Sequence, residues 1–367
     1  MKNSKKTIVI GIFFFICLIY FLNSVINKKK IEALKEKKFE EVLKKRKVNN
    51  KINENNGIIN KKKYLKYMST YKVFEHVYPD GNKTSLTYKT KKGNKKALLW
   101  VHGFNDYYFH FNIGDMLVND YDTDIYAITL RRYGSTIKKD DNLLFYTDDL
   151  DEYLEDIDIC FNKILNNNYD KIIMYGHSTG GLTSTIYCDR GTYKKKINGL
   201  ILNSPFFDLN DSPFMEWILK NIIYYLGIIN PKFQLSGNDN TQWNATSEET
   251  LERFYFNPEY KLRGNSPIYA GWIKAVHYYQ NKIHNREINI NVPAIVLYSN
   301  KTLKYPVQDD GDNVLDVNEI NKYSNYLGGT NEVVEYIIKN ATHDVLCSED
   351  KPRDKAISIM MNFIKNI

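Results

Sequence analysis

The chain has 367 residues and a formal net charge of +8, a length that suits one α/β domain carrying an insertion. The charge does not indicate nucleic-acid binding. Residues 28–64 hold 14 Lys and Arg against 5 Glu, and residues 1–27 add three Lys, which leaves −4 for the rest. The four cysteines form no disulfide framework and the seven histidines show no metal-ligand spacing, so no metal or other cofactor is implied.

Residues 7–26 are apolar apart from Thr7, Asn23 and Ser24, and lysines flank them on both sides. About 20 helical residues span roughly 30 Å, the thickness of a bilayer core. We therefore expect residues 1–27 to form an N-terminal transmembrane helix in a single-pass membrane protein. A cleaved secretory signal and a buried core helix are the alternatives, but the run is long and no small-x-small cleavage site follows it. More lysines follow the span than precede it, which weakly favours a cytosolic body.

Residues 28–64 are predicted to form a basic stalk and linker. Residues 28–47 have the composition of a charged helix, and residues 48–64 are rich in Asn and Lys, as flexible linkers are. The helix is expected to act as a stalk attracted to anionic headgroups, or simply as a solvated spacer. The folded domain is then residues 65–367.

Strand-like and helix-like runs alternate through most of this domain. Residues 68–89 are predicted to form an opening hairpin, and residues 148–165 an amphipathic helix. Short buried strands are expected at residues 97–101, 124–130, 171–175, 198–203, 292–298 and 333–338. This alternation predicts a mostly parallel sheet with helices on both faces.

Between about residues 205 and 266 the alternation breaks. The segment carries a dense apolar set on helix-like stretches, namely Phe206, Phe207, Phe214, Met215, Trp217, Ile218, Ile222, Ile223, Tyr224, Tyr225 and Leu226. We expect an inserted helical cap whose apolar underside covers acyl chains and gates entry. The alternative is a helical hairpin packed tightly on the sheet, with its aromatic residues as ordinary core.

The stretch Gly176-His177-Ser178-Thr179-Gly180 has the form G-x-S-x-G. It joins the strand at residues 171–175 to a helix-like run, and a serine in such a turn is held in a strained backbone with its hydroxyl exposed. A serine hydroxyl is a weak nucleophile at neutral pH, so it needs a general base and an acid that orients the base. Ser178 is the predicted nucleophile; a glycine-rich turn without chemistry is the alternative.

Several further stretches resemble the serine α/β-hydrolases of the lysophospholipase and monoacylglycerol-lipase group. They are residues 100–106, 130–135, 176–181, 202–206, 312–317 and 343–344. The resemblance spans about residues 70–367 and implies an α/β-hydrolase fold. It also implies that His102-Gly103-Phe104 is the oxyanion turn, where the N–H groups of Phe104 and Thr179 bind the oxyanion and His102 props the turn. Residues 131–135 depart from the commoner Arg-Gly-His-Gly-x-Ser form.

The same resemblance places the general base in the loop after the last strand, where His343 stands. His76, His110, His277 and His284 lie elsewhere and are expected to be structural. The acid loop after residues 292–298 is longer than in that group. Asp312 matches the pattern of an acid followed by an apolar pair, and Asp316 is better read as a helix N-cap. Asp309, Asp310 and Asp208 remain alternatives.

Taken together, the sequence predicts a membrane-anchored serine carboxylester hydrolase. The expected substrate is a lipid-like ester, such as a lysophospholipid or a monoacylglycerol, or another hydrophobic ester. The partners are thus a small-molecule ester and a membrane, and no nucleic acid. An aminopeptidase of the same fold is one alternative, although the cap shows no carboxylate cluster for a free amine. A hydrolase-like membrane interaction protein without catalysis is the other.

Overall fold

The computed structural model describes residues 61–138, 143–236, 254–257, 259–261, 266–303, 310–329 and 331–367. The predicted transmembrane helix, most of the predicted stalk and the later part of the predicted cap lie outside these residues. Within the described part of the chain, no helix is both long enough and apolar enough to cross a bilayer.

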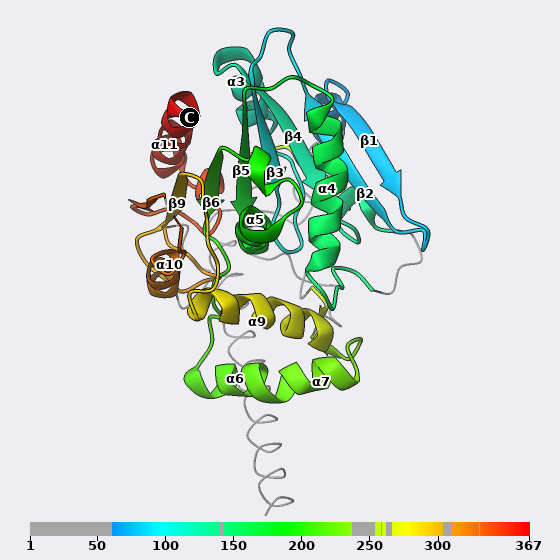
Figure 1. Cartoon of the computed structure of the whole chain (residues 1–367), viewed down its shortest axis with the longest axis vertical. Helices are drawn as coiled ribbons and strands as arrows, with labels where there is room; N and C mark the ends of the chain where they lie inside the picture. Colours follow the sequence, from blue (N-terminus) through cyan, green and yellow to red (C-terminus); the bar gives the residue numbers. More distant parts are fainter. Residues whose placement is uncertain are drawn as a thin grey trace, which may run out of the picture. The chain divides into compact units, whose positions relative to one another are not determined.

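A mostly parallel sheet of eight strands forms the centre of the domain (Figure 1). Its spatial order is β1-β2-β4-β3-β5-β6-β9-β10. The first two pairings, β1 with β2 and β2 with β4, are antiparallel, and all others are parallel. The strands are β1 (Lys72–Val77), β2 (Lys83–Lys89), β3 (Lys96–Val101), β4 (Thr123–Thr129), β5 (Lys171–His177), β6 (Gly199–Asn203), β9 (Ala294–Ser299) and β10 (Val333–Ile338). The predicted mostly parallel sheet is confirmed.

Helices cover both faces of the sheet because its inner strands are apolar on both sides. On β3, Leu99 packs into the core beneath α4 and α5, whereas Trp100 packs into the core beneath α3 and α11. The central strands are therefore continuous apolar runs in the sequence rather than alternating ones. The helices are α3 (Phe111–Asp120), α4 (Asp151–Leu165), α5 (Thr179–Arg190), α10 (Val317–Ser324) and α11 (Asp350–Asn366).

An insertion separates β6 from β9, in the region where the sequence predicts a cap. It begins with α6 (Pro213–Ile218), a π-helical turn (Leu219–Ile223) and α7 (Tyr224–Ile229). The hydroxyl of Ser212 caps α6 by accepting a hydrogen bond from the N–H of Met215. A short antiparallel pair, β7 (Gln234–Ser236) and β8 (Ile268–Tyr269), then leads into α9 (Ala270–His284).

The helices α6 and α7 lie over α9, beyond the end of the sheet at which β5 meets α5 (Figure 1). The approach of α7 to α9 is close at Gly227, where an added Cβ would lie 2.4 Å from the carbonyl oxygen of Ala270. The insertion therefore packs tightly on α9. This helix begins at Ala270, after the end of the predicted cap at about residue 266. Because β5 and β6 end on this side, the loops that follow them face the insertion.

Candidate active site

Ser178 occupies the sharp turn between β5 and α5. Its backbone has φ +53° and ψ −118°, a left-handed conformation that is strained for a residue other than glycine. The turn fits only because its neighbours lack side chains. A Cβ on Gly176 would lie 2.4 Å from the carbonyl oxygen of Gly180, and one on Gly180 would lie 2.3 Å from that of His102. The turn is thus pressed against the chain that leaves β3.

The turn after β3 lies directly against this serine. A Cβ on Gly103 would be 3.1 Å from the Cβ of Ser178. The His102 ring holds the turn, since its Nε2 accepts a hydrogen bond from the N–H of Leu130 at 3.1 Å and its Nδ1 donates to the carbonyl of Gly103 at 2.7 Å. Complete burial lowers the pKa of His102 and keeps it neutral. The His102 ring therefore has a structural role in this turn.

The turn after β3 and the start of α5 each supply one backbone N–H group. Phe104 follows Gly103 in the turn after β3, and Thr179 is the first residue of α5. The first N–H groups of a helix have no partner inside the helix and attract negative charge. These are the two groups that the sequence assigns to the oxyanion hole.

His343 follows β10 and pairs with Asp312. Its Nδ1 lies 2.9 Å from Oδ2 of Asp312, whose side chain is fully buried. The other oxygen, Oδ1, accepts hydrogen bonds from the N–H groups of Val314 and Leu315, both at 2.8 Å. The long loop returns to the sheet because the backbone of Asp312 pairs with residues 301–303, just after β9. Both the carboxylate and the backbone of Asp312 are therefore held in place.

The other candidate carboxylates have different partners. Asp316 caps α10 by accepting a hydrogen bond from the N–H of Asn318 at 2.9 Å. Asp310 pairs with Lys301 at 2.6 Å. Asp208 pairs with Lys220 at 2.9 Å. Asp309 lies outside the described residues.

Asn203, the last residue of β6, connects the serine turn to the histidine loop. Its carbonyl accepts a hydrogen bond from the N–H of Ser178 at 3.0 Å. Its side chain donates to Oδ1 of Asp344 at 2.6 Å and accepts from the N–H of Val345 at 3.2 Å. We did not predict a role for this residue from the sequence. The signal that could have identified it is a polar residue at the end of an otherwise apolar buried strand.

A second histidine, His177, lies beside the pair. Its ring centroid is 5.0 Å from that of His343, and its Nδ1 lies 3.3 Å from the carbonyl oxygen of Asn203. Burial lowers the pKa of His177 more than the nearby Asp344 carboxylate raises it. The ring packs against His343, a role that we did not predict from the sequence either.

Asp344 anchors a buried polar cluster behind the site. Its Oδ2 lies 3.3 Å from Nε2 of His110 and 3.2 Å from Sγ of Cys347, and its Oδ1 accepts a hydrogen bond from the N–H of Leu346 at 3.0 Å. Among the described residues, His110, Asp344 and Cys347 offer donor atoms close enough together to hold a metal ion. Because hydrogen bonds and the His110 contact already engage both oxygens of Asp344, we treat the cluster as structural.

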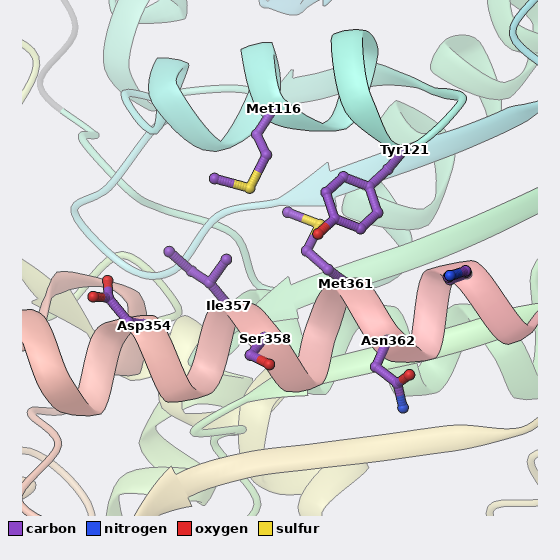
Figure 2. Close-up of a pocket in the computed structure, with 8 residues that line it drawn as sticks. Met116, Tyr121, Asp354, Ile357, Ser358, Met361 and Asn362 are labelled. Atoms are coloured by element: carbon purple, nitrogen blue, oxygen red, sulfur yellow. The ribbon is translucent and has the colours of Figure 1, made fainter.

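Aromatic side chains cluster beside the serine turn. Trp272 of α9 lies 4.8 Å from the Phe104 ring and 6.1 Å from the Phe206 ring, measured between centroids. The N–H of Phe206 donates to the carbonyl of Ser178 at 3.0 Å. A separate pocket of about 480 Å³ lies between α3 and α11, where Met116 and Met361 face each other (Figure 2). It shares no residue with this site.

The sheet order and the serine turn define an α/β-hydrolase. The sequence matches the family described as Hydrolase_4, serine aminopeptidase, S33, over residues 92–305. That match covers more than half of the chain, so the protein belongs to this family. No curated protein matches the sequence.

Solved structures with the same fold include lipases and an esterase. A soluble variant of monoglyceride lipase from Saccharomyces cerevisiae, in complex with a substrate analogue, has a TM-score of 0.60 and 16% identity, over 81% of this chain and 94% of that chain. The monoacylglycerol lipase of Paleococcus ferrophilus has a TM-score of 0.57 and 17% identity, over 81% of this chain and 98% of that chain. A thermostable carboxyl esterase from Bacillus coagulans has a TM-score of 0.56 and 14% identity, over 81% of this chain and 99% of that chain. At these identities the likeness shows the fold alone.

The Asp344 carboxylate predicts a pH dependence of stability. Burial opposes its charge, but His177, His110 and Asn203 together hold the pKa of Asp344 well below its usual value. A pKa that is lower in the folded state means that the charge stabilises the fold above the unfolded pKa, near 4, and that this stabilisation is lost as the pH falls. Asp344→Asn should therefore lower the free energy of unfolding at about pH 7 by roughly 3–5 kcal/mol.

Urea unfolding at several pH values tests this. The Asp344→Asn variant should lose less stability on acidification than the unmodified protein, because it lacks the charge that is titrated. Asp120→Asn, at an exposed position on α3, is the matched control and should change little. Equal acid sensitivity of Asp344→Asn and the unmodified protein would contradict the assignment.

Proposed function

We propose that the protein is a serine carboxylester hydrolase that acts through an acyl-enzyme on lipid-like esters, such as lysophospholipids or monoacylglycerols, or on other hydrophobic esters. The observation that carries the proposal is the His343–Asp312 pair, 2.9 Å apart, in a loop that Asn203 ties to the strained Ser178 turn. Nucleophile, acid and base follow one another along the chain in the order of α/β-hydrolases.

In the proposed mechanism, the Oγ of Ser178 attacks the ester carbonyl carbon while Nε2 of His343 takes the hydroxyl proton. Asp312 keeps Nδ1 protonated and stabilises the resulting imidazolium. The N–H groups of Phe104 and Thr179 bind the oxyanion of the tetrahedral intermediate. His343 then protonates the leaving alcohol. A water molecule, deprotonated by the same ring, hydrolyses the acyl-enzyme and releases the acid.

Two features support a hydrophobic substrate. The rings of Trp272, Phe104 and Phe206 lie together next to the serine turn, and apolar walls favour an acyl chain over a polar group. The insertion also exposes large apolar side chains, namely Phe214, Trp217, Tyr225, Ile228 and Ile229. Exposed aromatic and aliphatic side chains of this kind are typical of surfaces that lie near lipid.

The alternative of an aminopeptidase gains weight from the description of the family. Such an enzyme needs a free carboxylate to bind the substrate's amine. In the described part of the insertion, Asp208 and Glu216 both pair with Lys220, at 2.9 and 3.1 Å. Neither carboxylate is thus free for an amine. Hydrolysis rates for lysophospholipids, monoacylglycerols, short esters and aminoacyl amides, compared in one panel, distinguish the two functions; fastest turnover of the amides would favour the peptidase.

Ser178→Ala should lower ester hydrolysis by several orders of magnitude and abolish labelling by a fluorophosphonate probe, because the nucleophile is lost. His343→Ala should cost about as much, since the members of a catalytic triad act as a unit. Ser178→Ala should keep the melting temperature near that of the unmodified protein, whereas His343→Ala should lower it, because the buried Asp312 carboxylate loses its partner. Near-normal turnover by Ser178→Ala would refute catalysis at this serine, and a protein that neither turns over esters nor is labelled would be a non-catalytic interaction protein.

The acid is tested by a matched pair of substitutions. Asp312→Asn should reduce kcat about 10⁴-fold, the loss seen when the acid of a serine-protease triad becomes an amide, because the amide favours the wrong imidazole tautomer. Asp316→Asn should change kcat little, since Asn also caps a helix. Steady-state kinetics on a soluble ester measure both. The opposite ranking would transfer the role to Asp316.

Removal of residues 1–27 should release the protein from membranes, because it deletes about 20 apolar residues. Hydrolysis of a soluble short-chain ester should persist, since every proposed catalytic group lies at Phe104 or later. Flotation of membranes, with carbonate extraction, measures the distribution. Full-length protein that is found in the soluble fraction, or whose N-terminus is found near residue 27, would argue against an uncleaved single-pass anchor.

A further inference from the structure

The loop that follows the predicted oxyanion turn is held by a distant part of the chain. Residues 254–257 and 259–261, which come after α6 and α7, lie against residues 106–110. The hydroxyl of Tyr107 accepts a hydrogen bond from the N–H of Asn257 at 2.6 Å and donates to the carbonyl of Asn257 at 2.9 Å. The ring of Phe254 packs at 5.8 Å from Phe109 and at 5.1 Å from His110.

A buried ion pair completes this contact. Nζ of Lys261 lies 3.2 Å from Oδ1 of Asp106, and the two residues are 6% and 7% exposed. The ammonium also lies 5.2 Å from the centroid of the Phe109 ring. Taking two charges out of water costs as much as or more than their attraction returns, so an apolar pair would serve net stability at least as well. The pair instead fixes the position of the loop that bears Asp106 relative to the segment that bears Lys261.

That geometry is imposed two residues from a proposed oxyanion donor. Asn105, which separates Asp106 from Phe104, has φ +50°, a left-handed backbone that persists only where its surroundings hold it. Gly103, on the other side of Phe104, is pressed against Ser178. In the chain, Phe104 therefore stands between Gly103, which lies against Ser178, and Asn105-Asp106, whose carboxylate Lys261 holds.

We propose that Lys261 is a positioning residue, which acts through Asp106 to hold the Phe104 N–H in the oxyanion hole. The inference rests on the proposed ester hydrolysis. Its consequence is that the chain returning from the insertion sets the transition-state geometry, without itself touching the substrate. Lys261 binds the carboxylate, the carboxylate fixes the turn, and the turn directs the N–H.

The charges around the pair determine how it must be tested. Asp106 interacts electrostatically with His102, His177 and Asp344 as well as with Lys261. Loss of Lys261 alone leaves a buried carboxylate near His177, which adjoins His343. A variant that removes both charges, Asp106→Asn with Lys261→Met, separates the loss of geometry from the loss of charge balance.

The experiment uses full-length protein in detergent, with active sites counted by fluorophosphonate titration. Lys261→Met should lower kcat per titrated site about 10- to 100-fold on a p-nitrophenyl ester, a smaller loss than removal of an oxyanion donor. KM should change less than about threefold, because ground-state binding is retained. The affinity for a trifluoromethyl ketone, which forms a tetrahedral oxyanion on the serine, should fall in parallel with kcat/KM. Lys261→Arg should restore part of the activity.

Glu259→Gln is the matched control. Glu259 lies in the same segment as Lys261 and forms an exposed ion pair with Lys61. Loss of this pair should change none of these values. The double variant should be less impaired than the sum of its single variants. If Lys261→Met does not fold, Tyr107→Phe, which deletes both hydrogen bonds to Asn257, should show the same pattern.

Two results would overturn the inference: an unchanged kcat per titrated site, or a lower kcat with unchanged affinity for the ketone. Either would leave Lys261 a purely structural residue. Failure of the proposed function is distinct, because the unmodified protein would then show neither labelling nor ester hydrolysis.

Discussion

The site depends on the hydrogen bonds of Asn203. Its backbone carbonyl holds the N–H of Ser178, and its side chain holds both Asp344 and the N–H of Val345. Because Asn203 ends a fully buried strand, these bonds form away from water, where a lost partner costs most. The two loops that bear the proposed nucleophile and base, 165 residues apart in sequence, are thereby fixed to one point of the sheet. The carboxyl end of an inner strand thus helps to set their separation.

Much of the fold could be predicted from the sequence, because burial on both faces leaves a simple pattern. The β5 run and the glycines around Ser178 identify the strand-to-helix turn, since only glycine fits where an added Cβ would lie within 2.4 Å of a backbone oxygen. The catalytic roles remain predictions, although the structure brings Asp312 and His343 together. Asn203 and His177 could not be assigned in advance. Their partners are set by parallel pairing of distant strands, and no local pattern records which polar group faces which.

The ion pair between Lys261 and Asp106 is a further contact that the sequence does not predict. The two residues are 155 positions apart, and in the sequence each is one charge among many. Only their common burial distinguishes them from solvated residues. Two contacts thus reach the loop after β3 from this part of the chain: Trp272 of α9 packs against Phe104, and Lys261 pairs with Asp106. In the proposed mechanism, these contacts would couple the substrate pocket to the oxyanion hole, a coupling that a sequence pattern cannot reveal.

The central claim is that Ser178 carries an acyl group during turnover. Rapid mixing with a p-nitrophenyl ester, followed by acid quench and peptide mass spectrometry, measures it most directly. We expect a burst of p-nitrophenol close to one equivalent per titrated site. We also expect an acyl mass increment on the peptide that contains Ser178. Turnover without an adduct, or an adduct on a different residue such as Cys347, would contradict it.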